Sequence, residues 1–100
     1  MSIVLVLEGR VLPGRQQAME TILRDARPYY ESIGDVTMRF LWHTDDHHRF
    51  REEFTYHTDE AYRQDDERVE NDPEMQAYLN RWRALLDGDI SVSLWRTGCI

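Results

Sequence analysis

The sequence contains no lysine, because all twelve of its basic residues are arginine. Reactions that need a lysine nucleophile or a Schiff base are therefore excluded. Cys99 is the only cysteine, so the chain can form neither an internal disulfide nor a cysteine-rich metal site. Its five glycines are isolated from one another, and this excludes the glycine-rich loops that bind phosphates and dinucleotides.

Long apolar runs are also missing, so we expect no membrane-spanning segment, although 41% of the residues are hydrophobic. Nineteen acidic residues against twelve arginines give a formal charge of −7, which repels phosphate backbones. We therefore expect no nucleic-acid partner. The first residues lead directly into a predicted strand and lack the features of a signal peptide, which favours the cytoplasm. Without a linker or repeat, residues 1–100 are expected to form a single domain.

Alternation of apolar and polar residues predicts four strands, over residues 2–11, 35–44, 48–57 and about 89–97. Apolar residues at helical spacing predict helices over about 18–33 and 73–86. A nearly all-polar helix is predicted over about 59–70, where oppositely charged residues recur four positions apart. Thr58 is suited to cap the second helix, and Pro73 to the first position of the third. Pro28 lies inside the first apolar stripe, so we expect a kink or a break near Arg27.

The resulting order, β-α-β-β-α-α-β, predicts an α+β, ferredoxin-like fold: a four-stranded antiparallel sheet with its helices on one face. The opposite face is not fully polar. The first strand is apolar on both sides from Ile3 until Glu8, and Leu41 and Trp95 lie on the face that the helices leave bare. A second copy of the chain is the simplest cover for that face, so we expect a homodimer.

Three short segments also carry information about the family. They are the Val11-Leu12-Pro13-Gly14 joint, the run from Tyr56 to Ala61 that enters a helix, and the Asp72-Pro73 restart. Together with the order of elements, they resemble the antibiotic biosynthesis monooxygenase (ABM)-like family of the dimeric α+β barrel superfamily. The resemblance implies two sheets packed face to face in a homodimer. It also implies a ligand pocket, either between each sheet and its helices or in the shared barrel.

A reaction without cofactor or metal is a further implication of this resemblance. In the family's cofactor-free oxygenases, the anion of a small aromatic substrate itself passes an electron to oxygen. The heme-degrading branch instead uses a histidine in the helical region after the third strand and an asparagine early in the chain. Residues 58–88 contain no histidine and residues 1–34 contain no asparagine, so heme breakdown is disfavoured.

His43 is the best candidate for a general base, because histidine titrates near neutral pH. Arg39 lies on the same face of the predicted strand, roughly 13 Å away along it. A base and a cation that line one cavity can deprotonate a phenol or enol and hold its anion. With His43 as the base, activity rises with pH through its titration, at about pH 6.5 if unperturbed. The alternative is that both residues only solvate a dimer interface.

Three other residues are candidates for substrate binding. Trp95 is suited to stack on a flat aromatic substrate, or alternatively to pack in a dimer core. His57 is either a substrate contact or a strand-end residue that shields the start of the next helix. Glu8 is placed to orient Arg39 or His43, and it needs a partner if it is buried.

The histidines do not suggest a metal site. His43 and His57 lie at opposite ends of a predicted hairpin, too far apart to share an ion. His47 and His48 lie beside two aspartates at the hairpin turn, which lacks the fixed geometry of a dedicated site. We therefore expect no metal.

Two functions remain open on these residues. The first is a small, homodimeric, cofactor-independent monooxygenase that acts on a flat aromatic or quinol substrate. The second is a non-catalytic homodimer of the same fold that binds a small hydrophobic molecule or has a structural role. An internal cavity of at least about 300 Å³ touching His43, Arg39 or Trp95 would favour the enzyme, whereas a closed, fully packed barrel would favour the second function.

The apolar stripe of the last helix yields a prediction about stability, because it makes Leu79 and Trp82 core anchors. Replacing Trp82 by alanine should lower the free energy of unfolding by roughly 3–5 kcal/mol. The control is Asp66→Ala on the polar helix, which should change it by less than about 0.5 kcal/mol. Urea denaturation curves of the two variants measure the difference, and coincident midpoints would show that the stripe is wrongly assigned.

Overall fold

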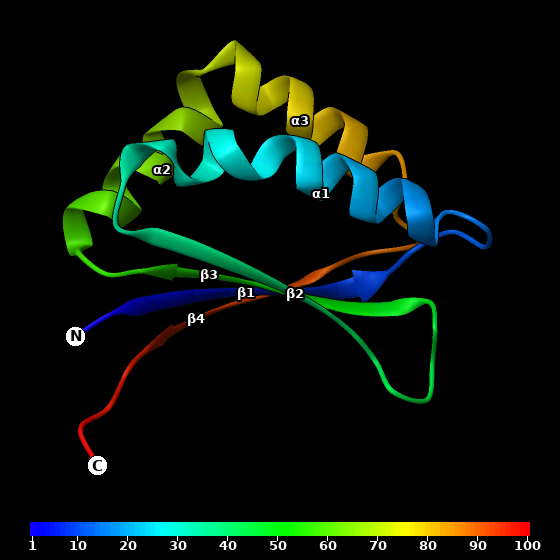
Figure 1. Cartoon of the computed structure of the whole chain (residues 1–100), viewed down its shortest axis with the longest axis horizontal. Coiled ribbons are helices and arrows are strands. Elements are labelled where there is room, and N and C mark those ends of the chain that lie inside the picture. The colour runs from blue at the N-terminus through cyan, green and yellow to red at the C-terminus, as the bar shows by residue number, and fades with distance from the viewer.

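The computed structural model describes every residue from Met1 to Ile100. Its elements are β1 (Ile3–Arg10), α1 (Gln16–Tyr30), the 3-10 helix η1 (Glu31–Ile33), β2 (Val36–Trp42), β3 (Arg49–Tyr56), α2 (Asp59–Asn71), α3 (Pro73–Arg83) and β4 (Ser91–Arg96). All strands pair antiparallel, in the order β2-β3-β1-β4, and the α-helices lie together on one side of the sheet (Figure 1). The predicted α+β, ferredoxin-like architecture is therefore confirmed.

The strand register decides which side chains face the helices. In β1 and β3, Leu5 lies opposite Phe54 and Leu7 lies opposite Glu52. On the other side of β1, Leu94 of β4 lies opposite Leu5. Because side chains alternate along a strand, this register places an apolar layer under the helices, with Glu52 as a carboxyl inside it.

The helices differ in how much they bury. The apolar stripe of α1 contributes the largest share of the core: Met19, Ile22, Leu23, Ala26 and Tyr30. From α3, Met75 and Trp82 are buried, whereas Leu79 is only partly buried. The polar helix α2 buries only Ala61 and Asp65, so apolar packing alone holds it weakly. None of these helices is long and apolar enough to cross a membrane.

The helix boundaries follow the capping residues. Thr58 Oγ1 accepts a hydrogen bond from the Ala61 N–H at 3.0 Å, as predicted for an N-cap. The predicted break near Arg27 is wrong, because α1 continues through Pro28 to Tyr30. Pro28 lies in the last turn and removes one hydrogen bond, to the carbonyl of Arg24. Both residues are exposed, so water can bind that carbonyl and the helix tolerates the loss.

The outer edge of β2 is partly blocked by a neighbouring side chain. The Met38 N–H, which no strand pairs with, donates to Glu31 Oε2 at 3.2 Å. Arg27 in turn donates to Glu31 Oε1 at 3.4 Å. A charged pair therefore occupies part of a free sheet edge.

The face of the sheet opposite the helices is uncovered and mixed in character (Figure 1). Leu41 and Trp95 on this face are 38% and 61% exposed. Between them runs a chain of ion pairs. Glu53 accepts from Arg39 at 2.7 Å and from Arg51 at 2.9 Å. Exposed aromatic surface beside a self-complementary set of charges is suited to pairing with a like surface.

This bare face leads us to expect a homodimer whose sheets pack face to face and bury at least about 1,000 Å² in total. Light scattering at micromolar concentration should give twice the monomer mass. Trp95→Glu should weaken the dimer at least about tenfold, because a carboxylate would be buried where an indole packs. Leu12→Glu, an equal change at an exposed loop residue outside this face, should leave the dimer intact. A monomeric wild-type chain would contradict the prediction.

Candidate ligand pocket

A pocket of about 350 Å³ lies between the sheet and the helices. Its lining is mostly apolar and comes from both layers: Leu5 and Leu7 of β1, Val92 and Leu94 of β4, Tyr62 and Val69 of α2, and Met75, Leu79 and Trp82 of α3. Val69, Val92 and Leu94 are 38%, 58% and 52% exposed, so an apolar rim faces solvent between α2 and β4. The size and lining suit a flat, mostly apolar molecule.

Glu52 is the most unusual residue of this pocket. It lies on β3 at a position that faces the helices, and only 2% of its surface is exposed. The Trp82 indole N–H donates to its Oε1 at 2.8 Å. Burial raises the pKa of the Glu52 carboxyl to about 7, and the hydrogen bond from Trp82 offsets only part of that effect. No arginine pairs with Glu52 in the structure.

The second oxygen of Glu52 is available to a ligand. Oε2 has no hydrogen-bond partner in the protein. Among the fully buried side-chain polar atoms, only Arg68 Nε lacks a hydrogen-bond partner. Glu52 Oε2 also lacks a partner, so it is not fully buried, and it borders the open space of the pocket. A carboxyl whose pKa is near 7 can take or give a proton at neutral pH. The pocket therefore contains a group suited to proton transfer, surrounded by apolar walls.

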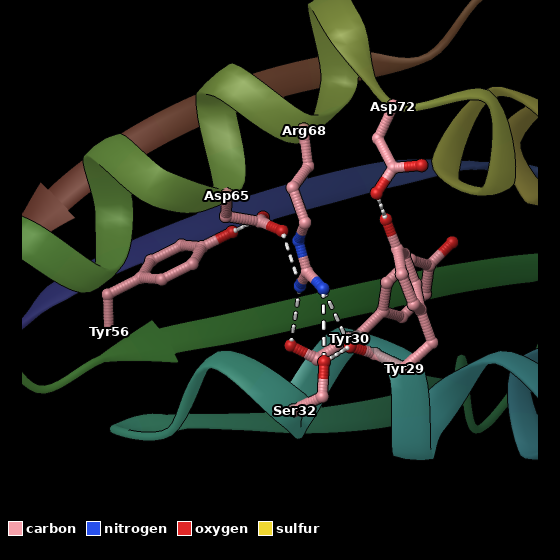
Figure 2. A network of polar contacts seen from close by, with 7 residues as sticks. All are labelled: Tyr29, Tyr30, Ser32, Tyr56, Asp65, Arg68 and Asp72. Atoms are coloured by element: carbon pink, nitrogen blue, oxygen red, sulfur yellow. Dashed lines mark hydrogen bonds and ion pairs between the residues drawn. The ribbon is translucent and has the colours of Figure 1, made fainter.

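A polar network at one end of the pocket joins α2 to the other elements (Figure 2). The Tyr56 hydroxyl donates to Asp65, and Arg68 donates to the same carboxylate at 3.2 Å. Arg68 also donates to the backbone carbonyls of Tyr29 and Tyr30, both at 2.9 Å, and so caps the C-terminus of α1. Burial first, and then the charge of Asp65, raise the pKa of the Tyr56 hydroxyl, which keeps it a donor. The network fixes α2 despite its small apolar face.

A second tyrosine–carboxylate contact reinforces this junction. The Tyr29 hydroxyl donates to Asp72, which also caps α3 by accepting from the Glu74 N–H at 2.9 Å. The Arg68 guanidinium lies 4.2 Å from the centre of the Tyr29 ring, within the range of a cation–π contact. Burial, followed by the hydrogen bond to Asp72, raises the pKa of Tyr29 to about 12.

None of the residues predicted from sequence for catalysis or substrate binding lines this pocket. His43 follows the end of β2, where its Nδ1 accepts from the Asp45 N–H at 3.1 Å. Arg39 is on the bare face in an ion pair with Glu53, and it borders a separate, mostly polar hollow of about 640 Å³ at the β2 edge. The catalytic roles of His43 and Arg39 stay predictions.

The three predicted substrate contacts also lie elsewhere. The Trp95 indole N–H donates to Ser93 Oγ at 2.9 Å on the bare face. His57 lies 3.5 Å from the hydroxyl oxygens of Ser2 and Thr37. Glu8 pairs with Arg51 at 3.9 Å. The structure thus links Glu8 and Arg39 through one chain of ion pairs, whereas His43 and His57 remain apart.

Glu52 is the functional candidate that sequence reasoning missed. A signal for it was present, since the alternation in residues 48–57 puts Glu52 on the same face as Phe50 and Phe54. A single carboxyl at an inward position of an otherwise apolar strand face indicates either a buried ion pair or a functional acid. No comparable signal identified Trp82 as its hydrogen-bond donor.

No protein-family model matches the sequence, and a search of curated proteins finds no relative in sequence. Solved structures, by contrast, superpose over nearly the whole chain. SnoaB, a cofactor-independent oxygenase from Streptomyces nogalater, matches with a TM-score of 0.80 at 14% identity, over 99% of this chain and 95% of its own. This chain has the fold of the antibiotic biosynthesis monooxygenases.

Two further structures support that conclusion and show its breadth. A putative antibiotic biosynthesis monooxygenase from Bordetella bronchiseptica matches with a TM-score of 0.80 at 14% identity, over 98% of each chain. A NIPSNAP family protein from Agrobacterium tumefaciens matches with a TM-score of 0.73 at 13% identity, over 98% of this chain and 94% of its own. These superpositions establish the ABM-like fold. At identities this low they do not establish the chemistry, which has to be argued from the residues of the pocket.

The raised pKa of Glu52 yields a prediction about stability. Between about pH 4.5 and pH 7 the folded protein keeps a proton that the unfolded chain releases, so stability falls as pH rises through this window and then levels off. Glu52→Gln keeps the acceptor for Trp82 and removes the titration. From pH 5 to pH 8 the wild type should therefore lose about 2–3 kcal/mol of unfolding free energy relative to the variant.

Glu53→Gln is the matched control on the opposite face. Burial alone would raise the pKa of Glu53, but hydrogen bonds from Arg39 and Arg51 outweigh it and lower that pKa. Glu53 therefore stabilises the folded protein above the unfolded pKa and loses this contribution in acid, the opposite sign to Glu52. Both pH 5 and pH 8 lie above the ordinary pKa of a glutamate, so Glu53→Gln should change stability almost equally at the two values, and urea titrations at both measure this. Parallel pH dependences of wild type and Glu52→Gln would contradict the prediction.

Proposed function

We propose that the protein is a cofactor-independent monooxygenase that takes a flat phenol or quinol into the pocket between its sheet and helices, with Glu52 as the base. The observation that carries the proposal is the unpaired oxygen of Glu52, a carboxyl with a pKa of about 7 in an apolar pocket of about 350 Å³. The likeness to SnoaB, a cofactor-independent oxygenase, supports this class of reaction. The aromatic and aliphatic walls suit a flat ring.

The proposed reaction balances without an added cofactor. Glu52 takes the phenolic proton, and the ring anion passes one electron to O₂, which gives a ring radical and superoxide. These combine through a new C–O bond to a peroxide anion, which takes the proton back from Glu52, and loss of water from the resulting hydroperoxide leaves a carbonyl. A phenol and O₂ thus give a quinone and water: one oxygen atom enters the product, and the substrate supplies all four electrons.

Each part of the pocket has a role in this scheme. The apolar walls keep water away from the anion and maintain the high pKa of Glu52, which matches its basicity to a substrate that is a weak acid. Trp82 holds one oxygen of the carboxyl and directs the other toward the ring. The homodimer would cover the bare face, where Trp95, His57, Glu8, Arg39 and His43 lie.

A second candidate is a non-catalytic protein that binds a small hydrophobic molecule. The same apolar pocket favours it, because binding a flat ligand needs no base. NIPSNAP family proteins share the fold, so the fold does not favour the enzyme over the binding protein.

Oxygen consumption with a panel of anthrones and quinols tests the proposal. Glu52→Gln should lower kcat by at least about 10²-fold, the typical contribution of a general base. His43→Ala should remain active, because His43 lies outside the pocket. Wild-type activity should rise with pH through about 7, as Glu52 becomes ionised.

The other outcomes separate the alternatives. An active Glu52→Gln with an inactive His43→Ala would make His43 the base. Ligand binding without oxygen consumption across the panel would support the non-catalytic protein.

A further inference from the structure

Glu52 is not the only unpaired polar group in the pocket. Tyr30, the last residue of α1, also lines it and is 6% exposed. The neighbouring hydroxyls of Tyr29 and Tyr56 both donate to carboxylates, whereas the Tyr30 hydroxyl has no hydrogen-bond partner (Figure 2). Since it is also absent from the fully buried unpaired atoms, this hydroxyl reaches the open space of the pocket. A hydroxyl that faces a pocket and has no partner in the protein is suited to contact a ligand.

Tyr30 is fixed by contacts to both its backbone and its ring. Arg68 binds its backbone carbonyl at 2.9 Å. The ring packs edge-on against Phe54, with centroids 5.5 Å apart, and against Tyr78 at 6.1 Å. A side chain packed in this way points its hydroxyl in a fixed direction, and such fixed donors are the groups that orient ligands.

Tyr30 and Glu52 line the same pocket, and the Tyr30 ring packs on Phe54, the next residue on the same face of β3 as Glu52. Burial, and next the charge of Glu52, raise the pKa of the Tyr30 hydroxyl, so it remains a donor at any working pH. The two side chains nevertheless form no hydrogen bond. A permanent donor and a proton-accepting carboxyl that line one pocket are suited to a pair of ligand oxygens, one of which accepts while the other donates.

We propose that the pocket selects flat aromatic ligands with oxygens on adjacent ring atoms, one donating its proton to Glu52 and the other accepting a hydrogen bond from Tyr30. Tyr30 is then a specificity-determining residue. This inference rests on the pocket of the proposed function and names its substrate class. It requires no oxygen chemistry, so binding alone tests it.

Two isomeric probes with equal apolar area provide that test. In 2,3-dihydroxynaphthalene the hydroxyls are adjacent, whereas in 2,6-dihydroxynaphthalene they are on opposite sides of the molecule. Calorimetric titration of the wild-type protein at pH 8 should give about fivefold to tenfold tighter binding of the 2,3 isomer, the gain expected from one added hydrogen bond. Equal affinities, or no binding of either probe, would overturn the proposal without any variant.

Tyr30→Phe removes the hydroxyl and keeps the ring. It should abolish the preference by weakening the 2,3 isomer to the level of the 2,6 isomer. The matched control is Tyr78→Phe, which removes a hydroxyl from the adjoining ring that does not line the pocket. A Tyr30→Phe variant that retains the preference would overturn the assignment. If the isomers are distinguished but oxygen is never consumed, the ligand class stands and the monooxygenase proposal fails.

Discussion

The hydrogen bond between Trp82 and Glu52 is the contact on which the pocket depends. It joins the last helix to the middle of the sheet through two side chains that are 5% and 2% exposed. Burying a carboxyl without a cation lowers the stability of the folded protein, and an apolar side chain of similar size at position 52 would be more stabilising. Stability alone therefore does not explain Glu52. Keeping the carboxyl there keeps a proton-exchanging group inside an apolar pocket, and the surrounding packing maintains its raised pKa.

The polar network around Arg68 complements this contact. Helix α2 has too few buried apolar residues to dock by the hydrophobic effect alone. Arg68 compensates by binding carbonyls at the end of α1, while Asp65 accepts from Tyr56 of β3. These bonds attach α2 to both layers and place Tyr30 at the end of α1 in a fixed position. Structural and ligand-facing tyrosines thus lie side by side.

Much of the fold was predictable from the sequence, because it follows from local patterns. Alternation in β2 and β4 and the caps at Thr58 and Asp72 each depend on neighbouring residues. The candidate site was less predictable. Polar residues on the bare face, such as His43 and Arg39, are conspicuous in an alternating pattern, whereas the environment of Glu52 depends on Trp82, 30 positions away. Burial of one carboxyl by a distant helix leaves little trace in a local pattern.

The carboxylate of Glu31 at the outer edge of β2 affects whether another chain can add a strand to the sheet at high protein concentration. Open sheet edges let chains add strand to strand without limit, which is a route to fibres. An incoming strand would have to displace Glu31 from the Met38 N–H and expose a charge held by Arg27. At this N–H, the β2 edge is therefore closed to the addition of a strand from another chain.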